Sequence, residues 1–234
     1  MNGGRPPASD QTAPPGAVPP PGDALLAEVA AMKPVRTRSP GRSLARLATA
    51  GLAVSAIAVA AGGVRHDLDA LLAPWVLVLA VVFAAGAAAP LVLAVLPPRG
   101  AVLPDTARVG RAAGAVSILL LLVGFLAAPE APGRTVMPTG AAAFRMAWLH
   151  CAGMGMAVAL PLVVLACFAM RRLLPVGETR VAAAIGATGG AFGALALLFA
   201  CPMGGGLHVG LAHAGGVVLS AAAAALLLPR FLRA

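Results

Sequence analysis

The chain has 234 residues, of which 60% are apolar and only 11% are charged, and its formal net charge is +9. Soluble domains average about 45–50% apolar and about 25% charged residues. A chain of this composition lacks the polar surface that a soluble enzyme of the same length needs. The composition therefore predicts a protein whose solvent is a lipid bilayer.

Two segments precede the first apolar run. Residues 1–22 are rich in Pro, Gly and Ala and predict a disordered lead. Residues 23–43 predict a cytoplasmic docking segment, in which Asp23 is the expected N-cap of a short helix and Pro34 ends it. The apolar side chains of this helix share one face: Leu25, Leu26, Val29 and Met32. An isolated helix of about ten residues is marginal in water, so its apolar stripe needs either the inner leaflet or a partner protein.

Six long apolar runs fill residues 44–228, which we expect to form a transmembrane domain. They cover residues 44–64, 71–96, 112–128, 147–170, 181–201 and 207–228. Each run is about 17–26 residues long, enough for a helix to cross a hydrocarbon core of about 30 Å. The runs show no apolar–polar alternation, which argues against barrel strands. The predicted fold class is all-α, a polytopic membrane bundle of six transmembrane helices with a short cytoplasmic N-terminal helix.

The fifth run is distinguished by closely spaced glycines. Gly186 and Gly190 form one pair of small residues four positions apart, and Gly189 and Gly193 form a second, overlapping pair. Such pairs allow the backbones of neighbouring membrane helices to approach closely. We therefore expect the fifth helix to be tightly packed.

Lys and Arg are distributed unevenly among the segments between the runs. Fourteen lie before the first run or in its first turn, in the second and fourth gaps and in the tail at 229–234, whereas the other gaps hold only Arg65, Arg134 and Arg145. The positive-inside rule then places both termini in the cytoplasm. The net charge is explained by this topology and by contact with anionic lipids, without nucleic-acid binding.

The runs lack ionisable residues near their centres. Ion-coupled transporters usually carry such residues in the membrane, so a small six-span transporter is the weaker alternative, as is a membrane assembly protein. The sequence also lacks a phosphate-binding loop, a pair of catalytic carboxylates and a serine nucleophile motif. We therefore do not expect an enzyme.

Histidine and cysteine gather on the side that the topology turns outward. These residues are His150, Cys151, Cys201, His208 and His213. Three interpretations stay open: a disulfide between Cys151 and Cys201, a metal or haem site, and hydrogen bonding between helices. His208 and His213 are five positions apart, about 140° around a regular helix. This spacing argues against a metal site that uses both rings.

Several short motifs occur in a characteristic order. They are the helix at 25–32 followed by Lys33-Pro34-Val35-Arg36, the Arg-x-Asp-Leu element within 63–68, the cysteines and glycines of runs four and five, the histidines of run six, and the basic end at 229–233. In this order they resemble the bacterial six-helix membrane anti-sigma factors of the negative-regulator-of-sigma-F type. They are also similar to the myxobacterial anti-sigma factor of the light-induced carotenoid response. The resemblance covers roughly residues 24–233, with Thr37 where the family's segment leads us to expect proline.

The resemblance implies a function and a partner. The N-terminal segment would bind an extracytoplasmic-function sigma factor at the bacterial inner membrane and keep it from core RNA polymerase. The residues implied in this contact are Leu25, Leu26, Val29, Met32, Pro34, Val35 and Arg36. An envelope signal would release the sigma factor, by proteolysis or by conformational change, with the outward His and Cys residues as the candidate sensor. No cofactor is expected apart from a metal or haem at that group.

Overall fold

A computed structural model describes residues 22, 40–66, 73–96, 105–126, 140–170, 178–203 and 205–232. Contacts within the chain separate Met1–Thr37 from Arg38–Ala234, and every helix discussed below belongs to the second unit. Residues 23–39, which include the apolar face of the predicted docking segment, lie outside the described residues. So does the predicted lead at 1–22, apart from Gly22.

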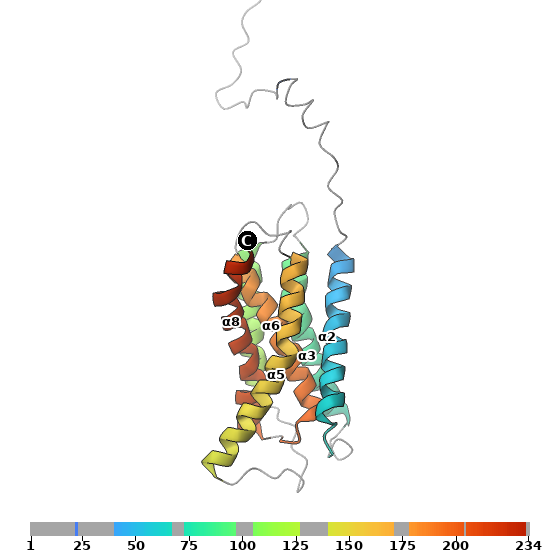
Figure 1. Ribbon diagram of the computed structural model, residues 1–234, viewed down its shortest axis with the longest axis vertical. Coiled ribbons are helices and arrows are strands. Elements are labelled where there is room, and N and C mark those ends of the chain that lie inside the picture. Colours follow the sequence, from blue (N-terminus) through green and yellow to red (C-terminus); the bar gives the residue numbers. More distant parts are fainter. Residues whose placement is uncertain are drawn as a thin grey trace, which may run out of the picture. The chain divides into compact units, whose positions relative to one another are not determined.

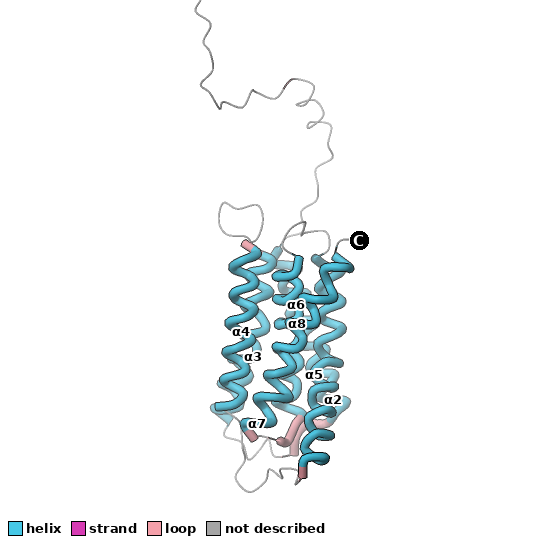
Figure 2. Tube along the Cα trace, turned by 90° about the vertical axis from the view of Figure 1, so that its left-hand side faces the viewer, coloured by secondary structure: helices cyan, strands magenta, loops and turns pink. Residues whose placement is uncertain are grey.

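Each predicted apolar run corresponds to one helix (Figures 1 and 2), and the bounds of run and helix differ by a few residues. The helices are α2 (Pro40–Gly62), α3 (Ala73–Val95), α4 (Thr106–Leu126), α5 (Ala141–Met170), α6 (Glu178–Ala200) and a continuous last helix made of α7 (Gly206–His208), η1 (Val209–Ala214) and α8 (Gly215–Leu232). The described residues contain no strand. Six helices are long and apolar enough to cross a membrane. The predicted all-α bundle of six such helices is thereby confirmed, whereas the predicted N-terminal helix lies outside the described residues.

The ends of α2 and α4 follow ordinary capping rules. Pro40 opens α2, where its fixed φ suits the first helical turn, and Gly63 after its end has a φ of +87°, which favours glycine. A carboxylate oxygen of Asp105 accepts the backbone N–H groups of Ala107 and Arg108, each at 3.0 Å. The hydrogen bond from the Arg108 N–H is the main cause that holds the pKa of the Asp105 carboxyl below its usual value, and the bond from the Ala107 N–H acts in the same direction.

Helix α6 is the centre of the bundle, and 94% of the residues in an 18-residue stretch of this helix are buried. It contacts α2, α3, α4, α5 and α8. Polar side chains in this core bond to backbone carbonyls: Thr188 Oγ1 donates to Ala87 O at 2.9 Å, and Ser55 Oγ donates to Phe192 O at 3.2 Å. Hydrogen bonds of this kind satisfy groups that neither water nor lipid could serve.

The glycines of α6 do allow the predicted close approach on two sides. A Cβ on Gly190 would lie 2.7 Å from the Cα of Val217 in α8, and one on Gly186 would overlap the carbonyl of Ser220. On an adjacent side of α6, a Cβ on Gly193 would overlap the carbonyl of Gly155 in α5. The two pairs thus serve two neighbours, and the sequence-based prediction of tight packing is confirmed.

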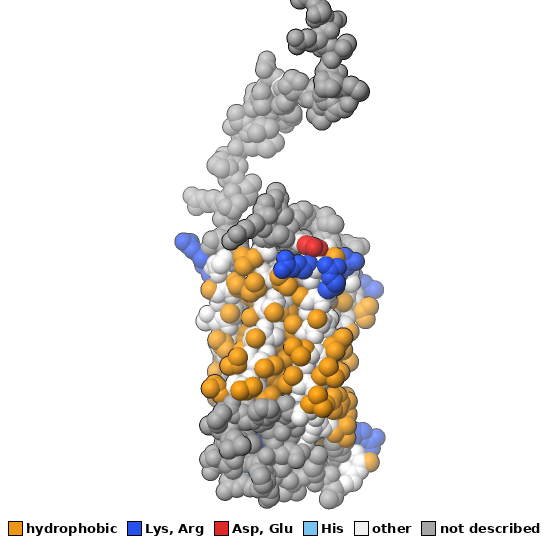
Figure 3. All heavy atoms as spheres, turned by 180° about the vertical axis from the view of Figure 1, so that it is seen from behind, with side chains coloured by type: hydrophobic (Ala, Val, Ile, Leu, Met, Phe, Trp, Pro, Cys, Tyr) orange, Lys and Arg blue, Asp and Glu red, His pale blue; other side chains and the backbone are white. Residues whose placement is uncertain are grey.

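The bundle has two chemically different ends. We call the end where α2 begins and α8 ends the proximal end, and the opposite end the distal end. Described arginines at the proximal end are Arg42, Arg46, Arg108, Arg111, Arg180 and Arg230, whereas Arg65 and Arg145 lie at the distal end. Between the ends, large apolar side chains such as Leu52, Leu77 and Leu122 are exposed on the sides (Figure 3). An apolar belt with charged ends suits a lipid environment.

Candidate functional site

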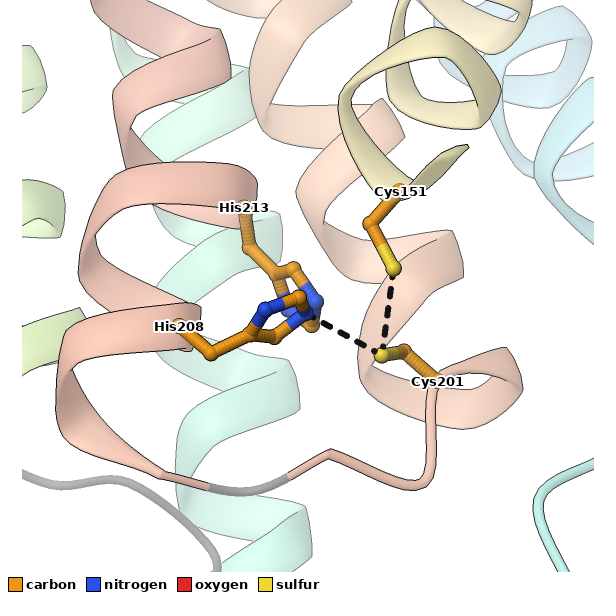
Figure 4. Close-up of side chains that lie close together, drawn as sticks. All are labelled: Cys151, Cys201, His208 and His213. Atoms are coloured by element: carbon orange, nitrogen blue, oxygen red, sulfur yellow. Dashed lines mark hydrogen bonds between the residues drawn. The ribbon is translucent and has the colours of Figure 1, made fainter. Parts of the chain in front are cut away.

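Four sulfur- and nitrogen-bearing side chains meet at the distal end (Figure 4). Cys151 comes from α5, Cys201 directly follows α6, His208 ends α7, and His213 lies in η1. All four are buried, and one potential ligand atom from each lies within 4.8 Å of the others. We call these residues the Cys2His2 cluster. Three separate parts of the chain therefore converge on one point.

The two histidines come together because η1 is a π-helix. In this turn the N–H of Gly215 donates to the carbonyl of Gly210, five positions earlier. An i→i+5 turn is wider than an α-helical turn, so a residue five positions on returns close to the same face. The ring centroids of His208 and His213 lie 5.3 Å apart with planes at 81°. The argument from 140° on a regular helix was therefore wrong, since this helix is not regular at that point.

Hydrogen bonds link the cluster through Cys201. The Sγ atoms of Cys151 and Cys201 are 3.3 Å apart, and Cys201 Sγ lies 3.4 Å from Nε2 of His208. Cys201 therefore contacts a thiol on one side and an imidazole on the other. Nε2 of His213 is buried and makes no well-formed hydrogen bond among the described residues, although its ring lies close enough to Cys201 to interact with that thiol. This nitrogen is therefore available to a further ligand in the cluster.

The surroundings of the cluster are apolar. Leu197 and Ala212 are buried with the two cysteines, and Trp148, Met154 and Met203 pack against them. These side chains keep water from the sulfur and nitrogen atoms. A ligand held here would therefore have to satisfy the polar atoms almost alone.

The geometry is compatible with a disulfide and with a metal site, and it contains the hydrogen bonds between helices that the third interpretation expects. The described cysteines are free thiols, and a separation of 3.3 Å between the sulfurs is longer than a disulfide bond of about 2.05 Å. Joining them would take a small movement and an oxidant that accepts two electrons, with loss of both thiol protons. Two thiols and two imidazoles are also the donor set of a tetrahedral metal site. The hydrogen bonds already present are those of the structural interpretation.

Arg65 is a distal residue whose position the sequence analysis did not anticipate. Its side chain is 3% exposed. Its backbone N–H donates to Phe199 O at 2.9 Å and its guanidinium donates to Pro202 O at 3.3 Å. Arg65 thus ties the chain after α2 to the residues on either side of Cys201. The motif at 63–68 was the signal that could have pointed to it.

The remaining predicted site residues lie elsewhere. His150 is exposed on α5 next to Cys151 and is not part of the cluster. Cys167 is half-buried farther along the same helix, toward the proximal end. The seven predicted contact residues between Leu25 and Arg36 are outside the described part of the chain.

The chain matches the family described as negative regulator of sigma F over residues 29–233. No curated protein matches it. No solved structure matches it. The family match includes all six long helices and the whole Cys2His2 cluster, and it begins within the predicted docking helix, at Val29. The resemblance to the negative-regulator-of-sigma-F type is thereby confirmed.

Proposed function

Because the chain belongs to the family of negative regulators of sigma F, we propose that it is a membrane-bound anti-sigma factor of the bacterial inner membrane. Its partner in this proposal is a sigma factor of the extracytoplasmic-function type, held at the membrane and away from core RNA polymerase. The observation that carries the proposal is the family match over 29–233 on a chain with six membrane-length helices. Regulators of this family are in general not enzymes.

The docking segment supplies the partner contact in this proposal. Leu25, Leu26, Val29 and Met32 recur at helical spacing, and an amphipathic helix binds a partner by laying such a face into an apolar groove. Pro34, Val35 and Arg36 follow directly and resemble the family's segment after that helix. Anchored to α2, this segment stays at the membrane surface, where it would retain the sigma factor.

The six-helix bundle provides a route for a signal. Most described arginines lie at the proximal end, which supports a cytoplasmic proximal end and, with it, a Cys2His2 cluster on the envelope side. Helix α2 follows the docking segment in the chain, and Arg65 after its far end bonds to Pro202, next to Cys201. A change at the cluster would therefore act on the helix that carries the docking segment.

A small transporter is the alternative of a different class. Among the described residues Arg65 is the one buried Asp, Glu, Lys or Arg, and it lies at an end of the bundle. Transport coupled to an ion usually needs such a residue within the membrane. This distribution supports a regulator more than a transporter.

The proposal predicts that single charges in the docking stripe abolish sigma binding. Leu26→Asp and Val29→Asp would each put a carboxylate into the apolar interface, at a cost of about 1–3 kcal/mol or more. We expect the tagged full-length chain to lose co-purification of the sigma factor encoded beside its gene. Transcription from promoters of that sigma factor should rise without inducer.

Ala27→Asp is the matched control, because Ala27 lies on the opposite face of the same predicted helix. This variant should bind the sigma factor as the original chain does. Equal binding by all three variants, or no sigma factor recovered with the original chain, would refute the proposed function.

A further inference from the structure

We propose that the Cys2His2 cluster is a metal site that binds one divalent cation of tetrahedral preference, with Zn²⁺ as the cation that fits best. The ligands are Sγ of Cys151, Sγ of Cys201 and one ring nitrogen each of His208 and His213. The inference concerns the bundle alone. If the proposed function also holds, the cation is part of the input that reaches α2.

The donor atoms match such a site in kind and come close to it in spacing. Two thiolates with two imidazoles form one of the common zinc ligand sets, and a tetrahedral S2N2 arrangement is characteristic of zinc. Metal–ligand bonds of about 2.0–2.3 Å place the ligand atoms of a tetrahedron about 3.3–3.8 Å apart. The observed separations are 3.3 Å between the sulfurs and 3.4 Å from Cys201 Sγ to His208 Nε2, and none exceeds 4.8 Å.

The fold brings the ligands together before any cation is bound. Helix α5, the end of α6 and the last helix each contribute, and the π-turn brings the second imidazole of that helix to the same face as the first. π-turns are rare in proteins, and those that occur are often found at functional sites. Its consequence here is that a helix which would otherwise offer one ligand offers two.

Charge and burial also favour a cation. Two thiolates balance the charge of one divalent ion, since binding requires the thiols to lose their protons. The resulting neutral complex suits the apolar enclosure made by Leu197, Ala212 and Trp148. A bound cation would give one nitrogen of each histidine a partner at the centre of the cluster. Buried and close-packed, such a site would hold its ion tightly.

The test uses the full-length chain purified in detergent, reduced and stripped of metal with a chelator. Titration with Co²⁺ should show one ion per chain, with the visible absorption of tetrahedral Co²⁺ and the near-ultraviolet band of thiolate coordination. Zn²⁺ should then displace Co²⁺ and abolish both signals, because zinc binds such sites more tightly. Binding is read without the sigma factor, so a failure here is distinct from a failure of the proposed function.

Variants decide whether the four residues are the ligands. Cys201→Ser and His213→Ala should weaken Co²⁺ binding by more than about 100-fold, since even changes behind the ligands cost 10–100-fold. His213→Cys keeps a ligand and should retain one Co²⁺ with a stronger thiolate band. This variant separates loss of a ligand from loss of the fold.

Cys167→Ser and His150→Ala are the matched controls, because they remove a thiol and an imidazole of α5 that lie outside the cluster. Both should bind one Co²⁺ unchanged. Absence of stoichiometric binding by the original chain, or full binding by His213→Ala, would overturn the proposal.

Discussion

At the scale of single residues, Arg65 links the chain after α2 to the loop that carries Cys201. Replacing it with alanine removes the bond to Pro202 and leaves a carbonyl without that donor, which should cost about 1–3 kcal/mol. We expect Arg65→Ala to lower the midpoint of thermal unfolding of the detergent-solubilised chain. If the proposed function holds, it should also raise sigma-dependent transcription without inducer, because the distal end of α2 is then held less firmly.

Arg145→Ala is the control for this prediction. Arg145 lies at the same end of the bundle but is exposed, and exposed charges contribute little to stability. Equal unfolding midpoints for the two variants would show that the buried position of Arg65 has no energetic consequence.

The histidines show where reasoning from single residues stops. The sequence showed that His208 and His213 would lie near the same end as Cys151 and Cys201, because topology fixes depth along a helix. It could not show that both rings face the same point, because that depends on a π-turn between Val209 and Ala214. The turn lies in a glycine-rich stretch with Gly210 against the ring of Phe125, a tertiary contact that local propensity does not encode.

At the scale of the helix, the packing of α6 depends on glycines that have no room for a methyl group. A Cβ on Gly190 would lie 2.7 Å from the backbone of Val217, and forcing an extra methyl group into a packed core costs about 1–3 kcal/mol. We expect Gly190→Ala to destabilise the chain by about this amount. The measurement is the midpoint of thermal unfolding in detergent, monitored through the loss of the helical circular dichroism signal.

Gly153→Ala is the matched substitution in α5, where nothing lies within 4 Å of the added Cβ. In a helix this change should be neutral or stabilising by up to about 1 kcal/mol. If Gly190→Ala and Gly153→Ala had the same midpoint of thermal unfolding, this result would contradict the close approach of α6 and α8. The pairing of glycines was readable from the sequence, but their assignment to α5 and α8 required the three-dimensional arrangement.

At the scale of the whole molecule, the number of helices and their length followed from hydrophobicity. The boundaries did not: α5 begins at Ala141, six residues before its apolar run, and includes Arg145. Helices continue past apolar segments when their last turns leave the hydrocarbon, and composition does not mark that point. The glycine pairs predicted that α6 is tightly packed, but its contact with α2, α3, α4, α5 and α8 could not be read from the sequence.

Orientation is the property on which the proposed signal route depends. The proximal arginines predict that this end faces the cytoplasm and that the distal end faces the envelope. His66 is exposed at the distal end and Asp105 at the proximal end. Single cysteines can be introduced at these two positions, in a chain whose natural Cys151, Cys167 and Cys201 are replaced by serine.

We expect a membrane-impermeant maleimide added to intact cells to label His66→Cys but not Asp105→Cys. Opening the inner membrane should make Asp105→Cys reactive, which controls for its accessibility. The reverse pattern would turn the Cys2His2 cluster toward the cytoplasm, beside any sigma factor rather than across the membrane from it. An envelope signal could then not reach the cluster directly, and the route through Arg65 and α2 would lose its reason. Labelling as predicted leaves α2 as the element that joins an outward cluster to an inward docking segment.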